Sequence, residues 1–288
     1  MIYDILFTAS TYKSTMSAIR FANSIKHIDG NHLCILTGPI REEIEEIARE
    51  TDAICFVSKT DSLYLGRAWG FVWALNNGIN AEYMCSCDDD IEFTSNSKDI
   101  LALLDKASEC GFSVAAFCNE AHDYADDKRF IGKIIEGDFV LNLSWVNGDC
   151  MFTHWQDNLY YGLPDTVLSS PISYYTEIEY QHRMRAMTDK PLLAVKNKDK
   201  YLHHFRTEDT AAIRAEQAGT GHVAGLHLWK LKYDLEITSI DKSVLADAFN
   251  AIKNDPVVAK HVMFREDVGW DWGAIYNSLK DDYEVIDG

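Results

Sequence analysis

The fold is decided by residues 3–37, which begin with the apolar run Tyr3-Asp4-Ile5-Leu6-Phe7-Thr8 and end with His32-Leu33-Cys34-Ile35-Leu36-Thr37. Both runs are rich in strand-forming residues without clean alternation, which is typical of strands buried on both faces. Between them, the apolar residues of 16–25 recur at helical spacing, and residues 29–31 form a turn signal. Residues 3–37 are therefore predicted to form a β-α-β unit.

The same alternation continues outward from this unit. It predicts helices at 41–50, 63–77 and 97–109, and strands at 53–57, 83–87 and 112–117. Such alternation favours an α/β fold with a mostly parallel twisted sheet and helices on both faces.

Beyond residue 118 the pattern is less regular. It predicts a charged loop at 121–133, strands at 139–145 and 192–195, a short segment at 150–156 leading into a loop, a helix at 177–187, and two or three helices within 243–280. We therefore expect one domain over residues 1–240 and a helical C-terminal extension over residues 241–288 packed on it.

The composition is that of an ordinary soluble globular protein, with 47% hydrophobic and 25% charged residues among 288. No apolar run approaches the roughly 20 residues of a membrane-spanning helix, and the first residues lack the pattern of a signal peptide. Seven cysteines lie mostly in apolar runs, as reduced core residues do. We expect a cytoplasmic protein without a transmembrane segment.

The spacing of Cys85-Ser86-Cys87 could suggest half of a zinc site. It lacks the usual wider spacing and a second pair, so two buried residues of a strand are the favoured interpretation.

Three consecutive aspartates, Asp88, Asp89 and Asp90, follow the predicted strand at 83–87. Open α/β sheets bind ligands at the carboxyl ends of their strands. Adjacent ionised carboxylates repel one another, and Mn²⁺ or Mg²⁺ would remove that repulsion and leave coordination positions for phosphate oxygens. The triplet is a candidate metal site, with an exposed acidic turn as the alternative.

The triplet resembles the DxD motif of glycosyltransferases with the GT-A fold, and further segments over about the first 205 residues follow the order of that family. The resemblance implies that a nucleotide-sugar donor contacts residues from the first strand, the helix before the triplet, the triplet and the segment 145–152. These are Thr8, Ala9, Ser10, Arg67, Asp88, Asp89 and Gly148.

The segment 175–183 is similar to the acidic helix start of the same family and places Glu177 at the position of the catalytic base. Thr176 and Glu177 depart from the usual Glu-Asp pair. Carboxylates in the first turn of a helix also interact favourably with the helix dipole, which is the alternative explanation of Glu177. For the metal, the resemblance implies Asp90 and Asp88 as ligands, joined by His203 or His204.

Together these features imply a hexosyl- or pentosyltransferase that uses Mn²⁺ or Mg²⁺ to move a sugar from a nucleoside-diphosphate sugar to a hydroxyl of a glycan or another acceptor. A base at Glu177 implies inversion of the anomeric configuration. A retaining glycosyltransferase, a metal-dependent nucleotidyltransferase and a noncatalytic sugar or nucleotide binder remain alternatives. Residues 8–15 contain Lys13 but no glycine, which counts against a nucleotidyltransferase phosphate loop.

The formal net charge of -18 also bears on the ligands. It disfavours nonspecific binding of nucleic acid, although a local basic groove remains possible. It would also repel an anionic sugar donor unless a metal ion neutralised the diphosphate.

Overall fold

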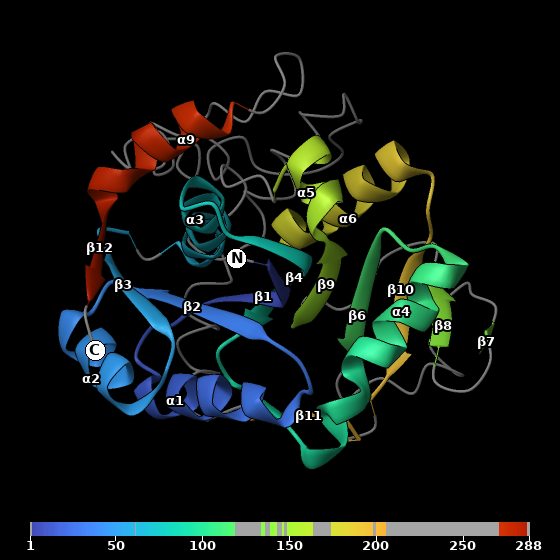
Figure 1. Cartoon of the computed structure of the whole chain (residues 1–288), viewed down its shortest axis with the longest axis horizontal. Helices are drawn as coiled ribbons and strands as arrows, with labels where there is room; N and C mark the ends of the chain where they lie inside the picture. The colour runs from blue at the N-terminus through green and yellow to red at the C-terminus, as the bar shows by residue number, and fades with distance from the viewer. Residues whose placement is uncertain are drawn as a thin grey trace, which may run out of the picture.

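The computed structural model describes residues 2–60, 62–118, 134–135, 139–142, 146, 149–163, 174–197, 200–205 and 271–286 (Figure 1). Their main sheet has the strand order β12-β3-β2-β1-β4-β9-β6-β10-β8-β7, and a second sheet pairs β11 with β5. The strands are β1 (Ile2–Ser10), β2 (His32–Gly38), β3 (Ile54–Ser58), β4 (Asn80–Asp88), β5 (Ile91–Phe93), β6 (Val114–Cys118), β7 (Ile134–Ile135), β8 (Phe139–Asn142), β9 (Cys150–His154), β10 (Leu192–Lys196), β11 (Leu202–His204) and β12 (Tyr283–Ile286).

Most strands of the main sheet run in one direction. Strands β3, β2, β1 and β4 are parallel neighbours, and β6 and β10 are parallel to each other. Strand β9 lies between β4 and β6 and is antiparallel to both, so β6 has the direction of β4. The predicted α/β fold with a mostly parallel sheet is confirmed.

Helices cover both faces of this sheet (Figure 1). One face packs on α1 (Thr15–Ser24), α2 (Arg41–Glu50) and α4 (Ile100–Cys110) through a core that includes Phe7 and Phe152. The other face packs on α3 (Leu63–Asn76), α5 (Trp155–Tyr161), α6 (Tyr174–Thr188) and α9 (Trp272–Leu279). Short 3₁₀ helices follow α1, precede α4 and follow α9, as η1 (Ile25–His27), η2 (Ser95–Asp99) and η5 (Lys280–Asp282).

Helix α3 contacts the strands through glycine, which leaves no room for a side chain there. A Cβ atom on Gly66 would collide with the hydroxyl groups of Thr37 and Ser10. The helix begins after Ser62, whose side chain accepts a hydrogen bond of 3.4 Å from the backbone of Leu65. This close approach fixes the start of α3 over the carboxyl ends of β1 and β2.

Several parts of the chain differ from the sequence prediction, and the short strands β5, β7 and β11 were not predicted. The loop predicted after residue 156 was wrong up to residue 161, because α5 covers Trp155–Tyr161, and residues 164–173 lie outside the described residues. At the C-terminal end, β12 was not predicted; it pairs antiparallel with β3, and Tyr283 stacks on Trp69 at 4.7 Å. The described end of the chain therefore joins the main sheet, and residues 241–270 lie outside the described residues.

Candidate functional site

The candidate site is built on the pairing of β4 with β9. Asp88 ends β4, and Asp149 directly precedes β9, in which Cys150 lies opposite Cys87. The backbone N–H of Asp88 donates to the carbonyl oxygen of Asp149 at 2.9 Å. Two carboxylates that are far apart in the sequence therefore lie side by side at the carboxyl end of β4.

A histidine reaches the same place through the small sheet. Strand β11 pairs with β5, which follows the aspartate triplet directly. His204 places Nδ1 3.1 Å from Asp149 Oδ2 and Nε2 2.9 Å from Asp90 Oδ1. Potential ligand atoms of Asp88, Asp149 and His204 all lie within 4.8 Å of one another. Two carboxylates and an imidazole thus converge into a set that could hold a divalent cation.

The charge on His204 follows from these contacts. Burial disfavours the imidazolium, but hydrogen bonds to Asp149 and Asp90 stabilise it and raise the pKa of His204 to about 10. The protonated ring balances the neighbouring carboxylates. A bound divalent cation would supply that positive charge instead and displace the proton, which is the usual coupling between metal binding and protonation. The carboxylate-rich ligand set fits Mn²⁺ or Mg²⁺, and the imidazole favours Mn²⁺ of the two.

The other predicted metal ligands lie differently. Asp90 is 2% exposed and accepts from His204, so its carboxylate orients the imidazole. His203 precedes His204 on β11, where successive side chains point to opposite sides, and its ring lies 5.9 Å from that of Phe205. Asp88, Asp90 and His204 are therefore brought together, and His203 is directed away from them.

Asp89 contacts a separate loop. Its carboxylate accepts a hydrogen bond from the hydroxyl of Ser14, just before α1. Burial raises the pKa of Asp89 to about 6, against the opposing effect of hydrogen bonds from Ser14 and Thr11. The side chain therefore ties the triplet to the loop that follows β1.

The three residues predicted at the end of β1 pack inside the protein. Thr8 and Ala9 have no exposed surface, and Thr8 faces Gly70 of α3. The hydroxyl of Ser10 contacts that of Thr37 at 2.8 Å and donates to the carbonyl oxygen of residue 63 at 2.8 Å. These side chains hold β1 against β2 and α3, and Gly148 lies outside the described residues.

Arg67 and Glu177 reach the site from α3 and α6. The buried guanidinium of Arg67 forms an ion pair with Asp88 through Nη2. Among the described residues, its Nε and Nη1 atoms are buried without a hydrogen-bond partner. One turn earlier on α3, the hydroxyl of Tyr64 donates to Oε1 of Glu177. Helix α3 therefore links Glu177 to the carboxylate cluster.

The environment of Glu177 suits a proton acceptor. Burial and then the negative charge of Asp88 raise its pKa to about 7, while the hydrogen bond from Tyr64 and the charge of Arg67 partly oppose that rise. A carboxyl group with this pKa is half ionised at neutral pH and can accept a proton efficiently.

Two residues of the site were not singled out from the sequence. Asp149 lies in the segment 145–152, which was interpreted as lining a sugar pocket, and Tyr64 lies in the predicted helix before the triplet. The position of Asp149 depends on the antiparallel pairing of β9 with β4. The sequence signal for it was an aspartate directly before an apolar run, which is too common to identify a ligand.

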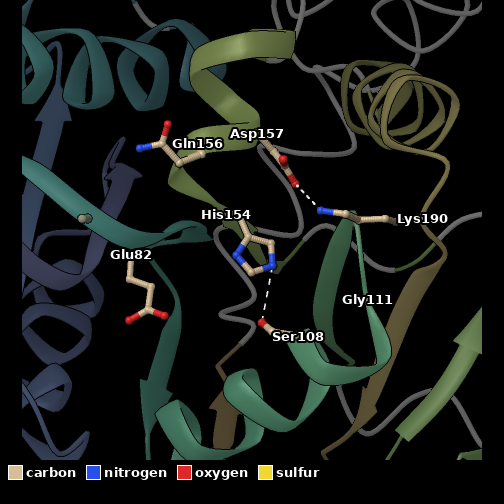
Figure 2. Close-up of a pocket in the computed structure, with 8 residues that line it drawn as sticks. Glu82, Ser108, Gly111, His154, Gln156, Asp157 and Lys190 are labelled. Carbon is tan, nitrogen blue, oxygen red and sulfur yellow. Dashed lines mark hydrogen bonds and ion pairs between the residues drawn. The ribbon is translucent and has the colours of Figure 1, made fainter.

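A hollow of about 420 Å³ lies elsewhere, near the beginning of β4 (Figure 2). Within it, the hydroxyl of Ser108 lies 3.4 Å from Nε2 of His154, and Lys190 pairs with Asp157 at 3.4 Å. Open α/β sheets bind their ligands at the other end of the strands, so this hollow is not part of the candidate site.

Within the described ranges, no helix has both the length and the apolar character needed to cross a membrane.

No family model matches the chain, and no curated protein matches it. Among solved structures, the chain is similar to S. aureus TarS 1–349, with a TM-score of 0.48 and 10% identity over 98% of this chain and 80% of that chain. For TarS 1–349 in complex with UDP, the TM-score is 0.47 and the identity 10%, over 96% of this chain and 79% of that chain. For the complex with UDP-GlcNAc, the TM-score is 0.48 and the identity 10%, over 98% of this chain and 80% of that chain. Similarity at this level carries no argument about function.

Proposed function

We propose that this protein is a metal-dependent glycosyltransferase that moves a sugar from a nucleoside-diphosphate sugar to an acceptor hydroxyl with inversion. The observation that carries the proposal is the convergence of Asp88, Asp149 and His204 at the carboxyl end of β4. Glu177, whose pKa is raised to about 7, lies on α6 and accepts a hydrogen bond from Tyr64 of α3. The resemblance of the aspartate triplet to the DxD motif supports the same function.

The metal, Mn²⁺ or Mg²⁺, would be held by Asp88, Asp149 and His204, and it would neutralise the charge that develops on the nucleoside diphosphate as it leaves. Asp90 has a supporting role in this proposal. Its contact of 2.9 Å with His204 fixes the orientation of the ring, as carboxylates beside metal-ligating histidines commonly do.

Arg67 provides a second contact to the anionic sugar donor. A buried guanidinium is costly unless its N–H groups are paired, and in Arg67 the Nε and Nη1 atoms have no partner among the described residues. Phosphate oxygens would satisfy them with strong, charge-assisted hydrogen bonds. The ion pair from Nη2 to Asp88 would hold the guanidinium in position for these contacts.

Glu177 serves as the base. Tyr64 donates to Oε1, which leaves Oε2 to accept the proton of the acceptor hydroxyl. The acceptor oxygen then bonds to the anomeric carbon as the bond from that carbon to the diphosphate oxygen breaks. The nucleoside diphosphate leaves with the bonding electrons, the configuration inverts, and Glu177 later returns its proton to solvent.

The test is a thermal-shift screen of nucleoside-diphosphate sugars with Mn²⁺ and with a chelator, followed by analysis of the products. We expect stabilisation by the sugar donor only with metal, release of nucleoside diphosphate, and an inverted anomer by NMR. His204→Gln should weaken Mn²⁺ binding, and His203→Gln is the matched control. Three results would contradict the proposal: release of pyrophosphate, a retained anomer, or sugar-donor binding that is as strong with the chelator as with Mn²⁺.

A further inference from the structure

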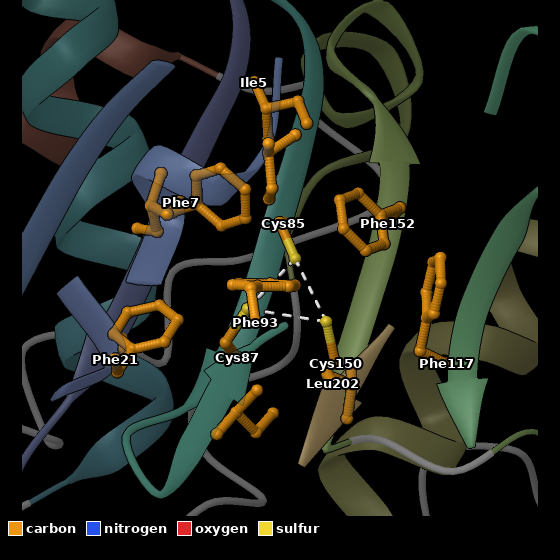
Figure 3. Packing of buried hydrophobic residues seen from close by; sticks show 14 of the residues in the cluster. Ile5, Phe7, Phe21, Cys85, Cys87, Phe93, Phe117, Cys150, Phe152 and Leu202 are labelled. Carbon is orange, nitrogen blue, oxygen red and sulfur yellow. Dashed lines mark hydrogen bonds between the residues drawn. The ribbon is translucent and has the colours of Figure 1, made fainter. Parts of the chain in front are cut away.

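Three cysteine thiols meet in the core beneath the carboxylate cluster (Figure 3). Their sulfur atoms are 3.0 Å apart for Cys85 and Cys87, 3.6 Å for Cys85 and Cys150, and 3.8 Å for Cys87 and Cys150. All three side chains are completely buried. They lie on the face of the main sheet that carries Phe7 and Phe152, and Phe93 of β5 belongs to the same core cluster.

The strand geometry explains why these thiols converge. Cys85 and Cys87 are two residues apart on β4, so both side chains point to the same face of the sheet. Cys150 is the direct cross-strand partner of Cys87 in the antiparallel pairing with β9. Two strands therefore supply one triangle of sulfur atoms, which neither strand could form alone.

Two edges of this triangle have about the length found in a metal–thiolate site, and the third is shorter. Metal–sulfur bonds of about 2.3 Å place the sulfur atoms about 3.8 Å apart in a tetrahedral arrangement and about 4.0 Å apart in a planar one. The separations of 3.6 and 3.8 Å approach these values, and the separation of 3.0 Å between Cys85 and Cys87 is shorter than either of them by about 0.8–1.0 Å. Binding of an ion would require the side chains of Cys85 and Cys87 to separate by about 0.8–1.0 Å.

The donor atoms select the kind of ion. Thiolates favour soft cations such as Cu⁺ and Zn²⁺. In the described part of the chain, no fourth histidine, cysteine or carboxylate joins the three sulfur atoms. A structural Zn²⁺ site would require a fourth ligand, whereas Cu⁺ does not.

We propose that Cys85, Cys87 and Cys150 form a three-sulfur site for a soft cation, with Cu⁺ as the ion that fits it. The site is distinct from the carboxylate cluster, because the two groups share no residue and the adjacent side chains of Cys87 and Asp88 on β4 point to opposite faces of the sheet. Cys87 and Cys150 directly adjoin Asp88 and Asp149 in the chain, so a bound ion would fix the spacing of the strands that carry both carboxylates. The proposal does not depend on glycosyl transfer.

The experiment measures Cu⁺ binding to the chain of residues 1–288, reduced and under anaerobic conditions, in competition with a chromophoric Cu⁺ chelator. Cys110 is exposed, so Cys110→Ser serves as the background in all samples. We expect one tightly held Cu⁺ per chain. Cys150→Ser should lose it, whereas Cys34→Ser, which removes a thiol outside the triangle, should keep it.

X-ray absorption on the Cys110→Ser protein with Cu⁺ bound gives a measurement that does not depend on the folding of the other variants. We expect three sulfur neighbours at about 2.3 Å. Fewer than three sulfur neighbours, nitrogen or oxygen neighbours, no retention against the chelator, or equal retention by a folded Cys150→Ser protein would overturn the proposal.

Discussion

Replacing Glu177 with glutamine is expected to remove activity and, above neutral pH, to stabilise the fold. The reason lies in the pKa of Glu177, which burial and the charge of Asp88 raise from 4.5 to about 7. Between these two pH values the folded state binds a proton that the unfolded state does not bind. The free energy of unfolding therefore decreases as pH rises through this window, and the full cost is present above pH 7.

The size of this cost follows from the same pKa difference. One pKa unit corresponds to about 1.4 kcal/mol, so a rise from 4.5 to about 7 gives a cost on the order of 3 kcal/mol at pH 8. Glutamine carries no charge, and its amide oxygen can still accept the hydrogen bond from Tyr64. Glu177→Gln should therefore be more stable than the wild type at pH 8 by up to this amount, and nearly equal to it at pH 4.5.

The assay is urea unfolding at pH 4.5 and pH 8 in the presence of a chelator, so that metal binding does not contribute. Glu46→Gln, on the exposed side of α2, is the matched control. Its free energy of unfolding should differ from that of the wild type by the same small amount at both pH values. Sugar transfer by Glu177→Gln should fall by about 10²- to 10⁴-fold while the affinity for the sugar donor is kept. The reasoning would be refuted if the stability difference between wild type and Glu177→Gln were the same at both pH values.

Three further predictions concern neighbouring residues. Tyr64→Phe removes a hydrogen bond that lowers the pKa of Glu177, so this pKa should rise in the variant. The acid limb of the pH–rate profile should therefore move to higher pH, and an unshifted profile would exclude this contact. Asp149→Asn removes a carboxylate from the cluster and should weaken Mn²⁺ binding in a direct titration, and unchanged affinity would exclude Asp149 as a ligand. Gly66→Ala should cost about 1–3 kcal/mol in urea unfolding because the added methyl meets two hydroxyl groups. Gly273→Ala, where the added methyl makes only an ordinary contact, is its control, and equal effects of the two would contradict this account.

The sequence alone predicted the regular part of the fold well. The predicted helix at 41–50 coincides with α2, and the other helices and strands predicted between residues 2 and 118 lie close to their predicted positions, whereas β5 was not predicted. These elements are readable because their burial patterns are local. A strand buried on both faces is continuously apolar, and a helix packed on one side repeats every three to four residues.

Elements that depend on distant partners were harder to predict. Strand β9 is five residues long and inserts antiparallel between β4 and β6, and β11 is three residues long and pairs with β5. Short segments carry too few residues for a period to be recognised. Strand β12 likewise joins β3 from the far end of the chain.

For the site, the sequence determined the position of the aspartates at the end of a strand and the presence of an acidic residue at 177. The tertiary structure decided their partners. Strand register turned His204 rather than His203 toward Asp149, and the β4–β9 pairing placed Asp149 beside Asp88 and Cys150 beside Cys87. The physical reason is that side chains alternate along a strand, so a shift of register by one residue would exchange the groups that face the site. Register is set by pairing across the sheet, which local sequence does not specify.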